Sequence, residues 1–199
     1  MIRKYLAFLK EIIDKLDREP IGALIEELVR LQRRKGRLFI LGVGGSAANA
    51  SHAVNDFRNL CEIEAYCPSD NVAELTARTN DEGWETVFKE WLKISKLNEN
   101  DLLLIFSVGG GDEKRKISVN LIEAIKYAKR TKTKIAGVVG RDGGYVKKEA
   151  DICILIPTVN EYLITPFVES FQSIIWHLMV FKPDLNIKNG KWEEIALEK

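Results

Sequence analysis

The sequence predicts a doubly wound α/β fold, in which helices cover both faces of a mainly parallel sheet. Three observations support this prediction: continuous apolar segments typical of buried strands, helix candidates between them, and glycine-rich turns after two of these strands. Parallel strands need crossover connections, which are usually helices, so this alternation indicates one parallel sheet. A chain of 199 residues has the length of a single domain, residues 1–199.

Two amphipathic helices are expected before the first strand, within residues 1–35. Apolar residues recur at helical spacing from Tyr5 to Leu16, and again from Leu24 to Leu31. Pro20 precedes the second series and is favoured in the first turn of a helix. The apolar faces of this pair must either cover the domain or meet another subunit.

The remaining chain divides into an α/β core, residues 37–181, and a C-terminal tail, residues 182–199. Strands are expected at 38–43, 102–108, 134–140 and 152–157, with a weaker fifth at 63–66. Helices are expected at 46–60, 82–96, 117–130, 144–149 and 164–181. Ligands of such folds bind at the carboxyl ends of the strands, near the point where the strand order reverses. This rule indicates four candidate ligand loops, Gly42–Ser46, Ser107–Asp112, Gly140–Gly144 and Pro157–Glu161.

Composition excludes several classes of partner. The chain has 30 Lys and Arg against 29 Asp and Glu, so its net charge of +1 gives no case for binding nucleic acid or an anionic membrane. Its three cysteines form no CxxC pair and leave one thiol outside any disulfide scheme, which fits a reducing compartment. Charged residues interrupt the apolar N-terminus, so we expect neither a signal peptide nor a membrane span. These observations predict a cytoplasmic protein.

Two loops share one design, in which an apolar strand runs into glycines and then a helix. They are Gly42–Ser46 and Ser107–Asp112. Exposed backbone N–H groups at a helix N-terminus suit an anion, although glycines can also simply end a strand. The chain has no GxGxxG or GxxxxGK[ST] motif at these loops, so nucleotide sites lack their signatures. The segment GRDGG at 140–144 is interpreted as a turn with Gly143 or Gly144 at positive φ and without chemistry.

Three segments together resemble the sugar isomerase (SIS) domain family, and within it the phosphoheptose isomerase branch. They are GVGGSAANASHAVND, FSVGGG and GVVGRDGGYVKKEADICILIP, followed by a long helix that carries a histidine. The resemblance covers about residues 37–181, and the N-terminal helical pair also fits. It implies a flavodoxin-like three-layer αβα sandwich with a five-stranded sheet, a homotetramer, and conversion of sedoheptulose 7-phosphate to D-glycero-D-manno-heptose 7-phosphate.

The resemblance also implies an acid/base set on two helices. His52 and Asp56 have i, i+4 spacing and so share one helical face, with Asp56 at a position where the branch usually has glutamate. Glu169, where the branch usually has glutamine, precedes His177 by eight residues on the late helix. Asp56 and His177 are expected to be the catalytic base and acid, or the reverse, in proton transfer between C1 and C2 through an enediolate.

The same four residues could bind a metal. His52, Asp56, Glu169 and His177 offer two nitrogens and two carboxylates, a set that suits Zn²⁺ or another divalent cation. The alternative for His177, which lies on an otherwise apolar helix, is a hydrogen-bonded core residue. The chain has two histidines, and both occupy family site positions, which favours function.

Substrate binding is assigned, again by resemblance, to Gly44, Gly45, Ser46, Asn80, Asp81, Ser107, Gly109 and Gly110. The branch usually has a Ser/Thr-rich second loop and an asparagine at Val43, so contacts to the phosphate are expected to differ here. The basic residues 114–116 either supply compensating charge or form a solvated turn. The alternative for residues 80 and 81 is an ordinary helix cap.

Two other functions stay open. SIS domains also serve as non-catalytic modules that sense a phosphosugar or scaffold partner proteins, because one fold hosts many functions. Others are isomerases or deaminating enzymes for amino sugars, which generally carry two SIS domains or extra catalytic segments. The chain keeps both histidines at spacings that match the carboxylates of the acid/base set, and this favours the isomerase over the sensor.

Overall fold

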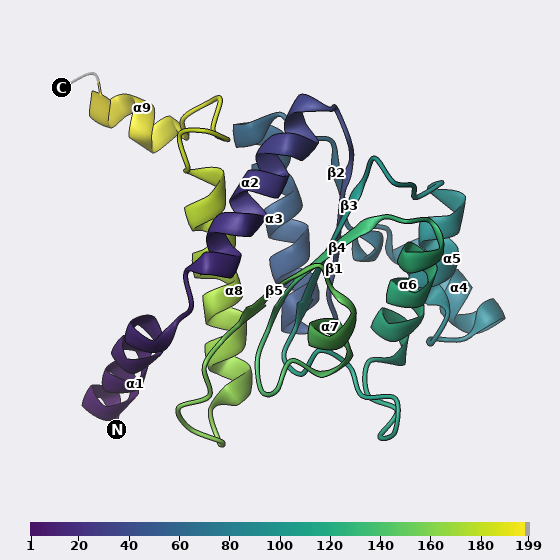
Figure 1. The fold of residues 1–199 in the computed structure, drawn as a ribbon, viewed down its shortest axis with the longest axis horizontal. Coiled ribbons are helices and arrows are strands. Elements are labelled where there is room, and N and C mark those ends of the chain that lie inside the picture. Colours follow the sequence, from purple (N-terminus) through teal and green to yellow (C-terminus); the bar gives the residue numbers. More distant parts are fainter. Residues whose placement is uncertain (198–199) are drawn as a thin grey trace.

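The computed structural model describes residues 1–197 and contains a five-stranded sheet between two helical layers (Figure 1). The strands are β1 (Leu38–Leu41), β2 (Ala65–Tyr66), β3 (Leu102–Ser107), β4 (Lys134–Val139) and β5 (Ile152–Leu155). Their order is β2-β1-β3-β4-β5, and every neighbouring pair is parallel. The predicted flavodoxin-like three-layer fold is confirmed, and the order reverses between β1 and β3.

One face of the sheet is covered by α2 (Glu19–Arg33), α3 (Gly45–Cys61) and α8 (Ile164–Val180). The larger apolar core lies between these helices and the strand residues that alternate toward them. The predicted helical pair is present, because α1 (Ile2–Lys15) precedes α2. In Figure 1, α1 extends away from the sheet, and Ile12 is its buried residue.

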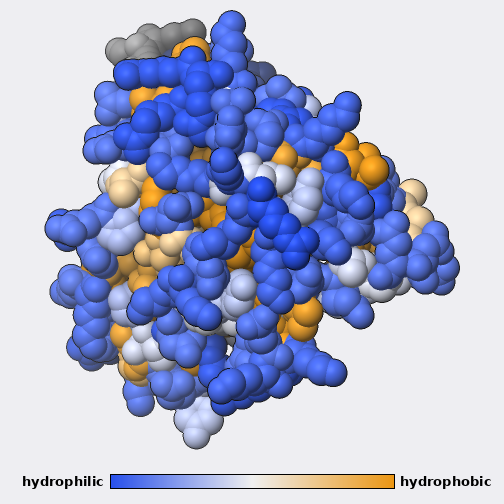
Figure 2. Space-filling model, turned by 45° about the vertical axis from the view of Figure 1, so that its right-hand side comes forward, coloured by the Kyte–Doolittle hydropathy of each residue, from blue (hydrophilic) through white to orange (hydrophobic). Residues whose placement is uncertain are grey.

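The opposite face is covered by α5 (Val87–Ile94), α6 (Val119–Arg130) and α7 (Gly144–Glu149) around a second core. Before them come a short 3-10 helix, Pro68–Asp70, and α4 (Val72–Glu82), which has no buried residue. The C-terminal tail includes α9 (Lys191–Leu197). The face shown in Figure 2 is mostly hydrophilic, with apolar residues in separate patches.

The prediction of one helix over residues 82–96 is wrong. The chain instead forms α4 and α5, separated at Gly83, whose φ of 87° is incompatible with a continuing helix. The four main strands begin at the predicted residues but end one or two residues earlier. No helix in the described part of the chain is both long and apolar enough to cross a membrane.

Candidate active site

Two helices bring His52, Asp56 and His177 together. His52 and Asp56 lie one turn apart on α3, and His177 lies on α8, which packs beside α3. The Nε2 atoms of His52 and His177 are 3.8 and 3.7 Å from Asp56 Oδ2. One carboxylate oxygen therefore faces two imidazole nitrogens that come from distant parts of the sequence.

Hydrogen bonds orient both Asp56 and His177. Asp56 Oδ1 accepts a hydrogen bond from Asn55 Nδ2 at 2.9 Å, while Oδ2 faces the imidazoles. His177 Nδ1 lies 2.8 Å from the carbonyl oxygen of Ser173. Because a carbonyl can only accept, Nδ1 carries the hydrogen, and in the neutral ring Nε2 keeps its lone pair. That tautomer leaves Nε2 able to take up a proton or bind a cation.

The cluster is open to solvent on its outer side. The side chains of His52 and His177 are 59% and 42% exposed, and that of Asp56 is 14% exposed. On the inner side, the ring of the fully buried Trp176 packs against His52 with centroids 4.7 Å apart. Burial and the negative charge of Asp56 raise the pKa of Cys61 to about 12, so this thiol stays protonated near neutral pH. The reactive groups of the cluster are thus a carboxylate and two imidazoles.

The packing of α3 against α8 fixes this geometry at both ends. Near the start of α3, Asn49 Nδ2 donates to the Glu169 carbonyl at 2.8 Å and to Gln172 Oε1 at 3.0 Å. At the end of α3, Cys61 Sγ lies 3.7 Å from the Val180 carbonyl oxygen. The two helices therefore run in the same direction, and the cluster lies between these two points of contact.

Glu169 does not join the cluster. A Cβ added to Gly45 would lie about 2.5 Å from the Glu169 carboxylate, so this side chain occupies the space beside the first turn of α3. A carboxylate is favoured at that position, because the N-terminus of a helix carries partial positive charge. Of the four predicted metal ligands, His52, Asp56 and His177 come together, and Glu169 lies near Gly45 instead.

The three clustered side chains fit a divalent metal by their chemistry. Their donor atoms all lie within 4.8 Å of one another. Two imidazole nitrogens and one carboxylate form a ligand set of catalytic zinc sites, which keep the fourth position open. The bond from His177 Nδ1 to the Ser173 carbonyl is the kind of support that fixes a metal-binding imidazole.

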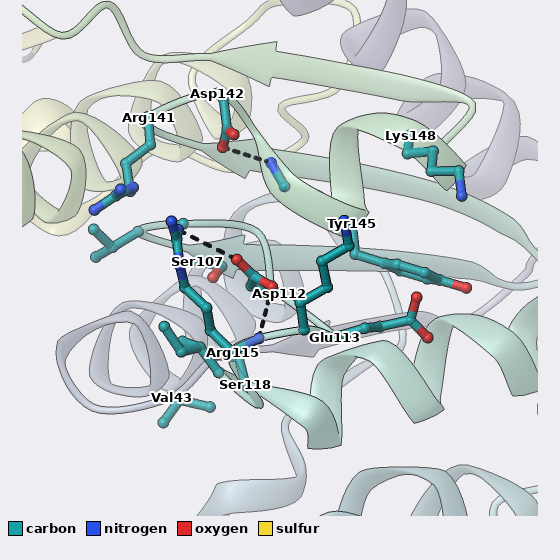
Figure 3. Close-up of a pocket in the computed structure, with 16 residues that line it drawn as sticks. Val43, Ser107, Asp112, Glu113, Arg115, Ser118, Arg141, Asp142, Tyr145 and Lys148 are labelled. Carbon is teal, nitrogen blue, oxygen red and sulfur yellow. Dashed lines mark hydrogen bonds and ion pairs between the residues drawn. The ribbon is translucent and has the colours of Figure 1, made fainter.

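A cavity of about 740 Å³ lies at the carboxyl ends of β3 and β4 (Figure 3). Its walls are the glycine loop after β3, the turn that follows it, and the loop from β4 to α7, with Val43 at one side. Of the predicted substrate-binding residues, Ser107 and Gly109 line it. No residue of the His52 cluster lines it, which agrees with the seven residues, about 10 Å of helix, that separate Gly45 from His52.

The glycine loop and the GRDGG turn interlock. The amides of Tyr145 and Val146 donate to the carbonyls of Gly111 and Gly110, each at 2.9 Å. A Cβ on Gly110 would come within 1.9 Å of the Gly143 carbonyl oxygen, so only glycine permits this approach. Gly143 and Gly144 have φ of 85° and 50°, which confirms the predicted turn.

Two predicted serines have different environments. Ser46, in the first turn of α3, is buried, and its hydroxyl has no hydrogen-bond partner among the described residues. Such a hydroxyl can bond to a ligand or water. Ser107 Oγ accepts a hydrogen bond from the Gly110 amide at 3.0 Å, which holds the glycine loop in its curved shape.

Asn80 and Asp81 lie apart from both the cavity and the cluster. They occupy the last turn of α4 and are exposed, and Asn80 Nδ2 donates to Asp81 Oδ1 at 2.8 Å. The alternative interpretation as an N-terminal helix cap is wrong, because Asn71 caps α4 by accepting from the Glu74 amide. Within one chain, these two residues contact no other part of the predicted site.

Sequence reasoning placed the GRDGG segment at the ligand-binding edge of the sheet but assigned it no chemistry, whereas the structure places it in the cavity wall. Arg141, Asp142, Gly144 and Tyr145 all line it. The topology predicts its location, because this loop follows β4, whose carboxyl end lies beside that of β3. Its contact with the glycine loop after β3 has no signal in the sequence.

Comparisons with known proteins agree with this fold. The SIS domain family model matches residues 2–140. The chain is 30% identical over 185 residues to the lincomycin biosynthesis protein LmbN of Streptomyces lincolnensis, across 90% of this chain and 67% of that protein. It is also 30% identical over 165 residues to the phosphoheptose isomerase of Chlorobaculum parvum, across 77% of this chain and 73% of that one. The solved phosphoheptose isomerase of Neisseria gonorrhoeae superimposes with a TM-score of 0.79 at 24% identity, covering 90% of this chain and 95% of that chain.

Proposed function

The chain belongs to the SIS domain family, and we propose that it is an aldose–ketose isomerase acting on a sugar phosphate. The proposed reaction converts sedoheptulose 7-phosphate to D-glycero-D-manno-heptose 7-phosphate. The phosphoheptose isomerase of Chlorobaculum parvum supports this substrate by its similarity along most of the chain. The observation that carries the proposal is the position of Asp56 Oδ2 between two imidazole nitrogens, at 3.7 and 3.8 Å.

The reaction moves a carbonyl from C2 to C1 and needs one base and one acid. Asp56 Oδ2 removes a proton from C1, and protonated His177 donates its Nε2 proton to the carbonyl oxygen on C2, which gives an enediol. His177 Nε2 then takes the proton from the hydroxyl on C1, and Asp56 returns its proton to C2. Both groups end in their starting protonation states, and the hydrogen bond from His177 Nδ1 to the Ser173 carbonyl holds the ring in place throughout.

The proposed metal ligands are His52, Asp56 and His177. A divalent cation such as Zn²⁺, if bound there, would take the place of the proton on His177 Nε2 and would supply Lewis-acid polarisation of the substrate carbonyl in place of that acid. Glu169 is the fourth proposed ligand, and its carboxylate would have to leave the space beside Gly45 to take part.

The proposed substrate contacts lie at the carboxyl edge of the sheet. Gly44, Gly45 and Ser46 belong to the start of α3, and Ser107, Gly109 and Gly110 belong to the loop after β3. The free hydroxyl of Ser46 supports its role. Asn80 and Asp81 do not line the cavity, so their proposed contact with substrate is one across a subunit interface of the homotetramer proposed below.

Exposed apolar side chains support the proposed homotetramer. Ile174 and Leu178 flank His177 on α8, and Leu6 and Ile13 lie exposed on α1. Exposed apolar residues on a pair of helices often mark a protein interface. A second copy on these helices would border the cluster and reduce its access to water.

The test is turnover of sedoheptulose 7-phosphate by the wild-type chain and two variants. Asp56→Asn and His177→Ala should lower the rate by ~10²–10⁴-fold, because each removes an acid/base group. Asp184→Asn, the same chemical change at an exposed aspartate outside the site, is the control and should keep full activity. If the wild type binds sugar phosphates but exchanges no C1 or C2 proton with deuterated water, with or without metal, the protein is a non-catalytic sensor instead.

A further inference from the structure

Most charges around the cavity at β3 and β4 are neutralised by neighbours. Arg115 pairs with Asp112 at 3.4 Å, and its amide donates to the same carboxylate at 3.0 Å. These contacts, the amide bond first, hold the pKa of Asp112 below its usual value, so the pair stays ionised and satisfied near neutral pH. Glu113 pairs with Lys126 at 2.9 Å.

The other acidic and basic residues of the wall are also engaged, with two exceptions. Asp142 accepts a hydrogen bond from the Gly144 amide at 3.2 Å, and Lys148 lies 3.7 Å from Glu149. Within residues 1–197, Lys114 and Arg141 line the cavity without an ion pair. An anion that enters the cavity could therefore pair with Lys114 or Arg141 without breaking an existing ion pair.

Arg141 is better placed than Lys114. Its Cδ lies 3.4 Å from the position of a Cβ on Gly109, so its side chain runs against the glycine loop. Figure 3 shows it extending from the β4–α7 loop on the side of the cavity where the Arg115 guanidinium lies. Lys114 instead lies in the exposed turn between Asp112 and Ile117, whose backbones pair with each other.

The glycine loop also offers backbone donors close to Arg141. The amides of Gly109 and Gly111 donate to no acceptor in the part of the chain that the structure describes. These two amides flank that of Gly110, which donates to Ser107 Oγ, and free amides in a curved loop can bind an anion. A guanidinium beside them adds the full charge and the paired donors that match phosphate oxygens.

Arg141 has a backbone conformation that glycine also adopts. Its φ is 55°, in the left-handed region that glycine adopts at no cost, and its loop already contains glycines at 140, 143 and 144. A residue with a Cβ costs roughly 1 kcal/mol there. Six other non-glycine residues among those described share this conformation, so its use here is practical: glycine can replace Arg141 without backbone strain.

We propose that Arg141 binds the phosphate group of the substrate, together with the free amides of the glycine loop. This inference rests on the proposed function for the identity of the substrate. In this proposal the positive charge that binds phosphate comes from the GRDGG loop. The loop after β3 supplies no such charge, because glycines follow Ser107 there. Residues 114–116, which the sequence offered as the source of that charge, then have no part in binding.

The test compares Arg141→Gly, Arg141→Lys and the control Lys114→Gly. Glycine suits the backbone at 141, so Arg141→Gly should fold at least as well as the wild type, as measured by its melting temperature. We expect this variant to raise KM for sedoheptulose 7-phosphate and the calorimetric Kd for inorganic phosphate by about 10- to 100-fold, with little change in kcat. The KM and Kd of Arg141→Lys should lie between those of the wild type and Arg141→Gly, because lysine keeps the charge but loses the paired donors.

The control Lys114→Gly should change neither KM nor the Kd for phosphate by more than about twofold, as expected for an exposed charge. If Arg141→Gly behaves like Lys114→Gly while the wild type turns over the substrate, the assignment of Arg141 is wrong and the proposed function stands. If the wild type turns over no sugar phosphate but loses inorganic phosphate binding in Arg141→Gly, the phosphate site stands and the isomerase proposal fails.

Discussion

At Asp56, the two carboxylate oxygens have different neighbours, and this difference predicts how the cluster responds to metal. Oδ1 is held by Asn55, whereas Oδ2 faces both imidazoles. We expect added Zn²⁺ to raise the melting temperature of chelator-treated protein, because binding at a hundredfold excess over Kd stabilises by about 2.7 kcal/mol. His52→Ala should abolish this rise.

Glu169→Gln is the informative companion variant. It should keep the metal-induced rise if Glu169 stays beside Gly45, as the structure has it. Thermal melts with zinc, nickel, manganese and iron measure the effect. The metal proposal fails if none of the four shifts the wild-type melting temperature.

Glu27 predicts a pH dependence of stability. Burial alone would raise its pKa, but hydrogen bonds from Lys134, Arg30 and Arg34 outweigh burial and hold the pKa below 4.5. The ionised form therefore stabilises the fold fully above pH 4.5, and this contribution is lost as the pH falls through the lowered pKa. Glu27→Gln should lower the free energy of unfolding at pH 7 by about 2 kcal/mol.

The difference between Glu27→Gln and the wild type should shrink as the pH falls below 4.5, in urea titrations at several pH values. Glu26→Gln is the matched control, because Glu26 also faces Arg30 but is largely exposed. An exposed pair contributes less than about 1 kcal/mol. A constant difference between pH 7 and pH 3 would contradict the assignment to Glu27.

At the scale of elements, the contact between the glycine loop and α7 depends on Gly110. Its φ is 70°, and an added Cβ would meet the Gly143 carbonyl oxygen at 1.9 Å. Gly110→Ala should therefore destabilise the fold by roughly 3 kcal/mol in urea unfolding, from the backbone conformation and the collision together. Gly22→Ala on α2, where an added Cβ meets nothing within 4 Å, should instead stabilise by about 0.5 kcal/mol. Equal effects of the two substitutions would contradict this interpretation.

The sequence predicted the elements whose burial produces an apolar pattern, and it missed the helices α4 and α9. The main strands start as predicted because buried parallel strands are continuously apolar. β1 ends early because the chain turns sharply at Gly42, where a Cβ would meet the Ser46 carbonyl oxygen at 2.3 Å. α4 has no buried residue, so it carries no apolar periodicity to predict a helix from.

At the scale of the whole molecule, the exposed apolar residues of α8 predict self-association. We expect light scattering at micromolar concentration to give the mass of four chains. The double variant Ile174→Glu, Leu178→Glu should dissociate, because it places charges in the proposed interface. Tyr162→Glu, at an exposed aromatic outside α1 and α8, should stay assembled. A wild-type mass equal to one chain would contradict the homotetramer.

The two halves of the site differ in how far the sequence could reveal them. His52, Asp56 and His177 were predictable because helical spacing and family positions identify them before their contact is known. The cavity at β3 and β4 was only half predictable, because the contact of residues 140–144 with the glycine loop depends on tertiary packing. The position of Glu169 beside Gly45 likewise has no signature in spacing.

The division of the cluster between α3 and α8 has a consequence for synthesis on the ribosome. All five strands lie before residue 156, whereas His177 belongs to the last helix that covers the sheet. A nascent chain can thus assemble its whole sheet while still lacking the imidazole of the proposed proton-transfer pair. On this proposal, the His52, Asp56 and His177 cluster forms only after α8 has left the ribosome.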